Sequence, residues 1–154
     1  MEPIGFIGTA TVALDSKGRT NLPRELRKQL PENSGGKVIV TLFADRSLAL
    51  RPIEEWNRYV KEELEPLAKS SAEGARFVMM VTSMARLSEL DAQNRLSLSP
   101  EQMKYASLEK DVTFAGDGAR IRLFNPEKYQ SLVDSAGSPE SMEACFYRTP
   151  FSGA

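Results

Sequence analysis

Hydrophobic and polar residues alternate along several short stretches of the chain, which is the pattern of half-buried β-strands. Near the N-terminus, Ala10, Val12 and Leu14 alternate with Thr11 and Ala13, as expected for a strand with one face in a core. A polar turn follows over 15–18, and residues 19–22 return as a second strand. A second hairpin is predicted over 37–51, with its turn at 44–46.

Helical patterns fill the segments between the hairpins. Pro23 suits the first turn of a short helix that we expect to end near Leu30. Apolar residues recur at helical spacing over 53–64, and Pro66 is expected to break or kink that helix. A further helix is predicted to begin near Ser71 and run to about Val81.

The chain repeats itself at a constant offset. Four residues of the first copy recur in the second, namely Leu14, Asp15, Arg19 and Leu22 as Leu90, Asp91, Arg95 and Leu98. Gly18 is matched by Asn94, and these are the two residue types that best tolerate a left-handed turn conformation. The correspondence continues, with 37–42 similar to 110–114 and 48–52 similar to 122–126.

The repeat predicts two related units in one α+β, mainly β, fold. We place unit 1 at 7–54, a helical connector at 55–82, unit 2 at 83–126, a C-terminal helix at 127–136 and a flexible tail at 137–154. Each unit is too small to bury a sufficient core easily by itself. The whole chain has 154 residues, of which 41% are hydrophobic and 27% charged, so it can build a shared core.

Composition excludes several kinds of chemistry. The chain has no histidine and one cysteine, which removes His-dependent catalysis, His-ligated metals and an intrachain disulfide. Acidic residues show no metal-ligand spacing, so we expect no metal, no cofactor and no catalytic residue. The longest apolar run, 77–81, is too short to cross a membrane, and no signal peptide is evident. A reducing cytoplasm fits the single cysteine.

Basic residues are concentrated near the first hairpin. The formal net charge of the chain is −1, yet residues 16–28 carry five basic side chains opposed by Glu25 alone. The turn places Lys17 and Arg19 on an exposed loop, where Ser16 and backbone N–H groups are also available to phosphates. Arg19 is the best candidate for a base contact, because its planar fork can pair with guanine.

A second group of basic residues follows on the predicted short helix, where Arg24, Arg27 and Lys28 share one face. From charge spacing alone, a solvated basic face explains these residues as well as a DNA site does. The second hairpin is much less basic, because Gln93 stands where the first has Lys17.

Asp15 and Arg19 can also pair across their own turn. Asp91 and Arg95 repeat this arrangement, which favours a structural role for the aspartates. We therefore assign Asp15, Asp91, Asn94 and Arg95 to the architecture of the hairpins.

The two Asp-x-x-x-Arg hairpins, together with 14–23 and the Leu50-Arg51-Pro52 junction before Glu55-Trp56, resemble the MraZ proteins over residues 5–135. The resemblance implies two AbrB/SpoVT-like units that exchange hairpins to complete one pseudo-twofold β-barrel within the chain. It also implies a ring-shaped homo-oligomer that regulates transcription in the cytoplasm, at the nucleoid. Such a ring binds repeated promoter boxes of a cell division and cell wall gene cluster in double-stranded DNA. By position, the DNA-contacting residues are Ser16, Lys17, Gly18 and Arg19.

Two rival functions stay open at this stage. An assembly or adaptor protein can act through the apolar helix 77–84 or through the tail, which holds Phe146, Tyr147 and Phe151. A hydrolase that uses carboxylates requires a cleft with a carboxyl group of raised pKa, and the sequence shows no sign of one.

Overall fold

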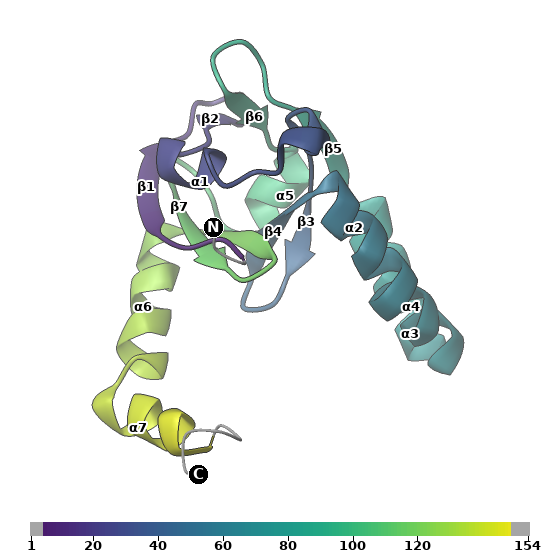
Figure 1. Cartoon of the computed structure of the whole chain (residues 1–154), viewed down its shortest axis with the longest axis vertical. Coiled ribbons are helices and arrows are strands. Elements are labelled where there is room, and N and C mark those ends of the chain that lie inside the picture. Colours follow the sequence, from purple (N-terminus) through teal and green to yellow (C-terminus); the bar gives the residue numbers. More distant parts are fainter. Residues whose placement is uncertain (1–4, 149–154) are drawn as a thin grey trace.

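Eight strands form two antiparallel sheets in the computed structural model, which describes residues 5–148 (Figure 1). The larger sheet has the strand order β1-β7-β8-β4-β3-β5, and β2 pairs with β6 in the smaller one. The strands are β1 Thr9–Ala13, β2 Arg19–Asn21, β3 Lys37–Phe43, β4 Ser47–Pro52, β5 Arg86–Glu89, β6 Arg95–Ser97, β7 Asp111–Asp117 and β8 Arg120–Phe124. The predicted α+β fold, mainly sheet, is confirmed.

Strands of the two repeats pair with one another. Val12 of β1 lies opposite Val112 of β7, and β5 pairs with β3 of the first repeat. Thr20 of β2 lies opposite Leu96 of β6. Each repeat therefore supplies strands that the other needs to complete its sheet.

The closed barrel implied by the resemblance is not found in the described part of the chain. No ladder over residues 5–148 joins β1 to β5, so the six-stranded sheet has two edges. The two-stranded sheet adjoins these edges through the two hairpin turns, where an isolated bridge joins Leu14 to Thr20, but over residues 5–148 no continuous ladder closes the sheet.

The core lies against one face of the six-stranded sheet. The alternation of β3 places Val38 and Val40 on this face. Buried side chains of β4, β7 and β8 join them, namely Leu48, Leu50, Val112, Phe114, Ile121 and Leu123. The hairpins close the core from the other side with Leu22, Leu26, Leu96 and Leu98. Burial of these leucines connects the loops of the hairpins rigidly to the sheet.

Helices are short near the core and longer outside it. They are α1 Arg24–Arg27, a 3₁₀ turn η1 Glu32–Ser34, α2 Ile53–Tyr59, a π-helical segment η2 Val60–Leu64, α3 Glu65–Ser70, α4 Ala72–Ser83, α5 Pro100–Tyr105, α6 Pro126–Ala136 and α7 Pro139–Arg148. In Figure 1 the α2–α4 and α6–α7 segments extend as two separate arms, at the end of the molecule opposite β2 and β6.

Two helix predictions differ from the structure. Helix α1 ends at Arg27, and the chain continues to Leu30 only through single turns, because the residue before Pro31 is biased away from helix. Of the two effects predicted for Pro66, a break is wrong, because helical backbone runs from Ile53 to Ser70, and a kink stays a prediction. The wider π-helical segment lies immediately before Pro66, where a proline without an N–H alters the hydrogen-bond spacing.

The C-terminal segment also differs from the prediction of a flexible tail over 137–154. Asn125 caps α6 by accepting N–H bonds from Glu127 and Lys128, and after Gly137 the chain forms α7. Phe151, which the adaptor interpretation included in the tail, lies outside the described residues.

Candidate nucleic-acid interface

The loop that joins β1 to β2, residues 15–19 (tip 1), is organised by one carboxylate. Oδ1 of Asp15 accepts the backbone N–H groups of Lys17 and Arg19, each at 2.9 Å. Oδ2 of Asp15 accepts Nε–H of Arg19 at 2.8 Å. The turn closes with the Gly18 N–H donating to the Asp15 carbonyl at 3.0 Å. One side chain therefore sets both the loop backbone and the direction of the Arg19 side chain.

These bonds favour the ionised form of Asp15. The backbone N–H of Arg19 makes the largest contribution to holding the pKa of the Asp15 carboxyl below its ordinary value. The Arg19 side chain and the backbone N–H of Lys17 also lower this pKa. Desolvation raises it, but by less than the Arg19 backbone hydrogen bond lowers it. Asp15 is thus an anion at neutral pH and serves as a fixed acceptor.

Gly18 is buried, and the structure gives it a supporting place rather than an exposed one. Its φ is +80°, and a Cβ at this position would lie 2.5 Å from the carbonyl oxygen of Leu98. The Gly18 carbonyl accepts the Leu98 N–H at 2.8 Å. Both backbone polar groups of Gly18 are therefore engaged within the protein and support tip 1, and a contact between Gly18 and DNA stays a prediction.

The remaining residues of tip 1 face solvent. Ser16 and Lys17 are exposed, and the Arg19 side chain keeps 38% of its surface accessible. In the part of the chain that the structure describes, the hydrogen bonds of the Arg19 guanidinium involve Nε alone. Its two terminal nitrogens are consequently available as a planar donor pair.

The three basic residues after tip 1, Arg24, Arg27 and Lys28, differ in burial and in their contacts. Arg24 is exposed, and Lys28 makes a loose pair with Glu25 at 3.7 Å. Arg27 is half-buried, and its Nη1 donates to the Leu22 carbonyl at 2.9 Å. The Arg27 guanidinium therefore helps to hold the end of β2, in addition to adding positive charge.

The loop between β5 and β6, residues 91–95 (tip 2), has the same internal geometry. Asp91 accepts the backbone N–H groups of Gln93 and Arg95, and its Oδ2 accepts Nε of Arg95 at 2.9 Å. Asn94 has a φ of +61°, in the place of Gly18. The Asp–Arg pairing predicted for both hairpins is confirmed, and the Arg95 side chain remains 32% exposed.

The two tips are joined through β2 and β6, which sequence reasoning did not find. Leu98 N–H donates to the Gly18 carbonyl, and the equivalent bond runs from Leu22 N–H to the Asn94 carbonyl. Asn21 Nδ2 also donates to the carbonyl of Gln93 at 3.2 Å. These contacts cross between the repeats, so a sequence pattern read within one repeat contains no signal for them. The two tips therefore extend from the same two-stranded sheet of β2 and β6. They differ in charge, because Gln93 stands in tip 2 where tip 1 has Lys17.

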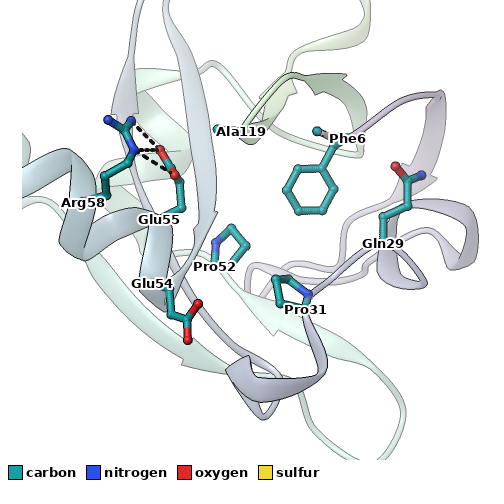
Figure 2. A pocket seen from close by; sticks show the side chains of 9 residues that line it. Phe6, Gln29, Pro31, Pro52, Glu54, Glu55, Arg58 and Ala119 are labelled. Atoms are coloured by element: carbon teal, nitrogen blue, oxygen red, sulfur yellow. Dashed lines mark hydrogen bonds and ion pairs between the residues drawn. The ribbon is translucent and has the colours of Figure 1, made fainter. Parts of the chain in front are cut away.

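A pocket of about 370 Å³ beside α2 tests the hydrolase interpretation (Figure 2). Its carboxylates are already engaged, because Glu55 pairs with Arg58 and Glu54 accepts a hydrogen bond from Asn33. Arg58 also forms ion pairs with Glu62 and Glu63. For Asp15 and Asp91 the pKa is lowered, which is opposite to what a general acid needs.

Residues 5–148 contain neither a metal-binding cluster nor a helix that could span a membrane. Within this range no group of three or more Cys, Asp or Glu side chains is arranged to hold a metal ion. No helix in the same range has the length and apolar character needed to span a bilayer. Cys145 is exposed as a thiol on α7.

Comparisons with known proteins agree with the duplicated architecture. A family profile described as "MraZ protein, putative antitoxin-like" matches residues 6–78 and 82–148. The chain belongs to the MraZ family. The two matched segments correspond to the two halves in which the hairpins were found.

Relatives in the family carry one name. A protein of Marinobacter nauticus is 29% identical over 89% of this chain and 92% of its own length. Proteins of Thiobacillus denitrificans and Anaeromyxobacter dehalogenans are each 31% identical, over 85% and 94% of this chain and 88% and 99% of their own lengths. All three are named "Transcriptional regulator MraZ", a name for a regulator and not for an enzyme.

Proposed function

We propose that this protein is a DNA-binding transcriptional regulator that contacts DNA through tip 1. The observation that carries the proposal is the arrangement of Asp15, which fixes the loop and the Arg19 Nε while Lys17 and the Arg19 terminal nitrogens face solvent. The names of its relatives support regulation of transcription as the setting. The protein is expected to act in the cytoplasm, at the nucleoid.

Arg19 supplies the base-reading group in this mechanism. A guanidinium whose Nε is held can still present its two terminal nitrogens to O6 and N7 of guanine in the major groove. Because the Asp15 contact orients the group before DNA arrives, less side-chain freedom is lost on binding.

Phosphate contacts are assigned to the side chains around Arg19. Lys17 and Ser16 flank the loop, and Arg24, Arg27 and Lys28 extend the positive surface along α1. Such contacts set affinity and register without reading sequence. Tip 2 has the same backbone but no lysine, and we assign Asp91, Asn94 and Arg95 to the architecture.

A ring of subunits explains how so small a basic surface binds specifically. One tip makes few contacts, whereas several tips at fixed spacing act together through effective concentration. The repeated boxes of a cell division and cell wall promoter are the proposed target. The exchange of β1 and β5 between the repeats supports units of the AbrB/SpoVT type with limits near 7–54 and 83–126.

The test compares matched substitutions at the two tips. Arg19→Ala is expected to weaken specific binding by about 1–3 kcal/mol, the range for a lost bidentate base contact. Lys17→Ala is expected to flatten the dependence of affinity on salt. Arg95→Ala and Gln93→Ala are the controls, because they alter the same positions of tip 2.

Titrations use a fragment of the DNA upstream of the protein's own gene and a scrambled fragment, each at several salt concentrations. Unchanged affinity and salt slope in both tip 1 variants remove tip 1 from the mechanism. Footprinting on the same fragment shows whether protected boxes recur at a regular spacing, as a ring requires.

A further inference from the structure

The two-stranded ribbon of β2 and β6 has one inner and one outer face. Thr20 and Leu96 lie opposite each other in this ribbon and are 2% and 1% exposed, so they point inward. Because side chains alternate along a strand, the residues on either side of these two share the outer face. We call this surface the ribbon face, and its residues are Arg19, Asn21, Arg95 and Ser97.

The ribbon face continues the surface of tip 1. Arg19 is the last residue of tip 1 and the first residue of β2, and Asn21 follows it on the same face. In Figure 1, β2 and β6 lie at the end of the molecule opposite the helical arms. The major groove of B-DNA is wide enough to admit a two-stranded ribbon. A duplex that contacts Arg19 therefore also meets the side chain of Asn21.

Asn21 presents an oriented amide group to solvent. Its side chain is exposed, and its Nδ2 donates to the Gln93 carbonyl at 3.2 Å. The NH₂ group has a second hydrogen, and among residues 5–148 no hydrogen bond reaches Oδ1 of Asn21. One N–H and the adjacent oxygen are therefore available in the plane of the amide. The contact with tip 2 fixes this plane, as Asp15 fixes the guanidinium of Arg19.

The fold alone gives little reason for an asparagine at this position. Asparagine is depleted in β-strands, whereas the neighbours of Asn21 serve the fold directly. Thr20 Oγ1 donates to the Ala13 carbonyl at 2.8 Å, and Leu22 is completely buried in the core. The single bond to Gln93 uses only part of the hydrogen-bonding capacity of the Asn21 amide. The remainder is free to bind a partner.

We propose that Asn21 is a specificity-determining residue that recognises an adenine in the major groove in which Arg19 recognises a guanine. Adenine presents the acceptor N7 beside the N6 amino donor at its major-groove edge. One N–H and the oxygen of an asparagine amide match this pair, and they match no other base equally well. The inference rests on the proposed function and adds a second recognised base to each box.

The geometry of the strand sets the distance between the two bases. Two residues of an antiparallel strand span about 6.8 Å. Two steps along a strand of B-DNA span about the same length, at about 3.4 Å for each step. A ribbon that lies along the groove therefore places the adenine of Asn21 two base pairs from the guanine of Arg19.

The test selects sequences from a pool of DNA duplexes with a randomised central segment. The full-length wild-type protein, Arg19→Ala and Asn21→Ala are each used for selection, and sequencing gives the base preference at every position. Arg19→Ala is expected to lose one guanine. Asn21→Ala is expected to lose an adenine two base pairs away, a preference of about 5- to 150-fold for a bidentate contact, and to keep the guanine.

The matched control is Ser97→Ala. Ser97 is the counterpart of Asn21 in the second repeat and lies on the same ribbon face, but a serine hydroxyl does not distinguish bases as an amide does. This variant is expected to keep both preferences. Thermal melts show that each variant is folded before selection.

Asn21→Asp separates base recognition from a structural role of this residue. A carboxylate cannot donate to N7 of adenine but can accept from the N4 amino group of cytosine. The variant is therefore expected to lose adenine at this position and to select cytosine there. Its added negative charge weakens binding to all duplexes alike, so relative selection is compared rather than affinity. A residue that only holds tip 2 in place would not exchange one base for another.

The possible results distinguish this inference from the proposed function. An adenine preference that persists in Asn21→Ala or Asn21→Asp overturns the role of Asn21, and so does an equal loss of every preference in Asn21→Ala. Loss of the guanine in Arg19→Ala then leaves the proposed function intact. Loss of the adenine in Asn21→Ala with no effect of Arg19→Ala contradicts the role of Arg19 alone. A wild-type protein that selects no sequence overturns both.

Discussion

Replacing Asp15 with asparagine separates the two tasks of this side chain. Oδ1 of Asp15 holds the loop backbone, and Oδ2 holds Nε of Arg19. Asparagine keeps one carbonyl oxygen for the two backbone N–H groups but presents an NH₂ group to the guanidinium. The loop is therefore expected to persist while Arg19 loses its orienting contact.

The magnitude follows from the freedom that Arg19 regains. Immobilising one flexible side chain on binding costs about 0.5–1.5 kcal/mol, which corresponds to about two- to tenfold in the dissociation constant. The same substitution removes a negative charge near DNA phosphates and so strengthens binding to any sequence. These effects have opposite signs, so the informative quantity is the ratio of specific to non-specific affinity.

Asp91→Asn provides the control for charge. Asp91 makes the same bonds in tip 2, and its side chain is 41% exposed against 40% for Asp15. Both substitutions are expected to strengthen binding to scrambled DNA similarly, whereas only Asp15→Asn lowers the specificity ratio, by about two- to tenfold.

Fluorescence anisotropy with the upstream fragment and a scrambled fragment measures both quantities for each variant. An unchanged ratio in Asp15→Asn, or an equal fall in Asp91→Asn, refutes the view that Asp15 orients Arg19 for base recognition.

Three further predictions concern the stability of the fold and of the tips. Gly18→Ala places a Cβ 2.5 Å from the Leu98 carbonyl at a φ of +80°, and a loss of stability of about 2–4 kcal/mol is expected in urea unfolding. Gln102→Ala removes a buried amide that donates to the Val40 and Met84 carbonyls, and calorimetry is expected to show about 2–4 kcal/mol lost. The pKa values of the Asp15 and Asp91 carboxyl groups are lowered in the folded protein. The two ionised carboxylates therefore stabilise the fold fully when the pH is above the ordinary aspartate pKa of about 4. This stabilisation is lost as the pH falls through the lowered pKa values. Carboxyl NMR titration of both aspartates checks the direction of the shift.

Much of the site was accessible from local patterns. The turn over 15–18 and its copy at 91–94 depend on bonds within five residues, so residue types at those spacings are sufficient to predict them. The excess of positive charge at tip 1 is likewise a property of composition along the chain. The Asn125 cap and the start of α4 at Ser71 are equally local.

Other features depend on residues that are distant in the chain. The sequence alone determines both hairpin turns, their difference in charge and the helix caps. Each of these depends on residues that lie within about five positions of one another in the chain. Only the tertiary structure turns Gly18 inward against Leu98, joins β1 to β7, and collects Arg51 and Arg120 around Phe43. Burial and cross-strand packing depend on which segments meet after the whole chain has folded, and a pattern read along one segment does not include its partner.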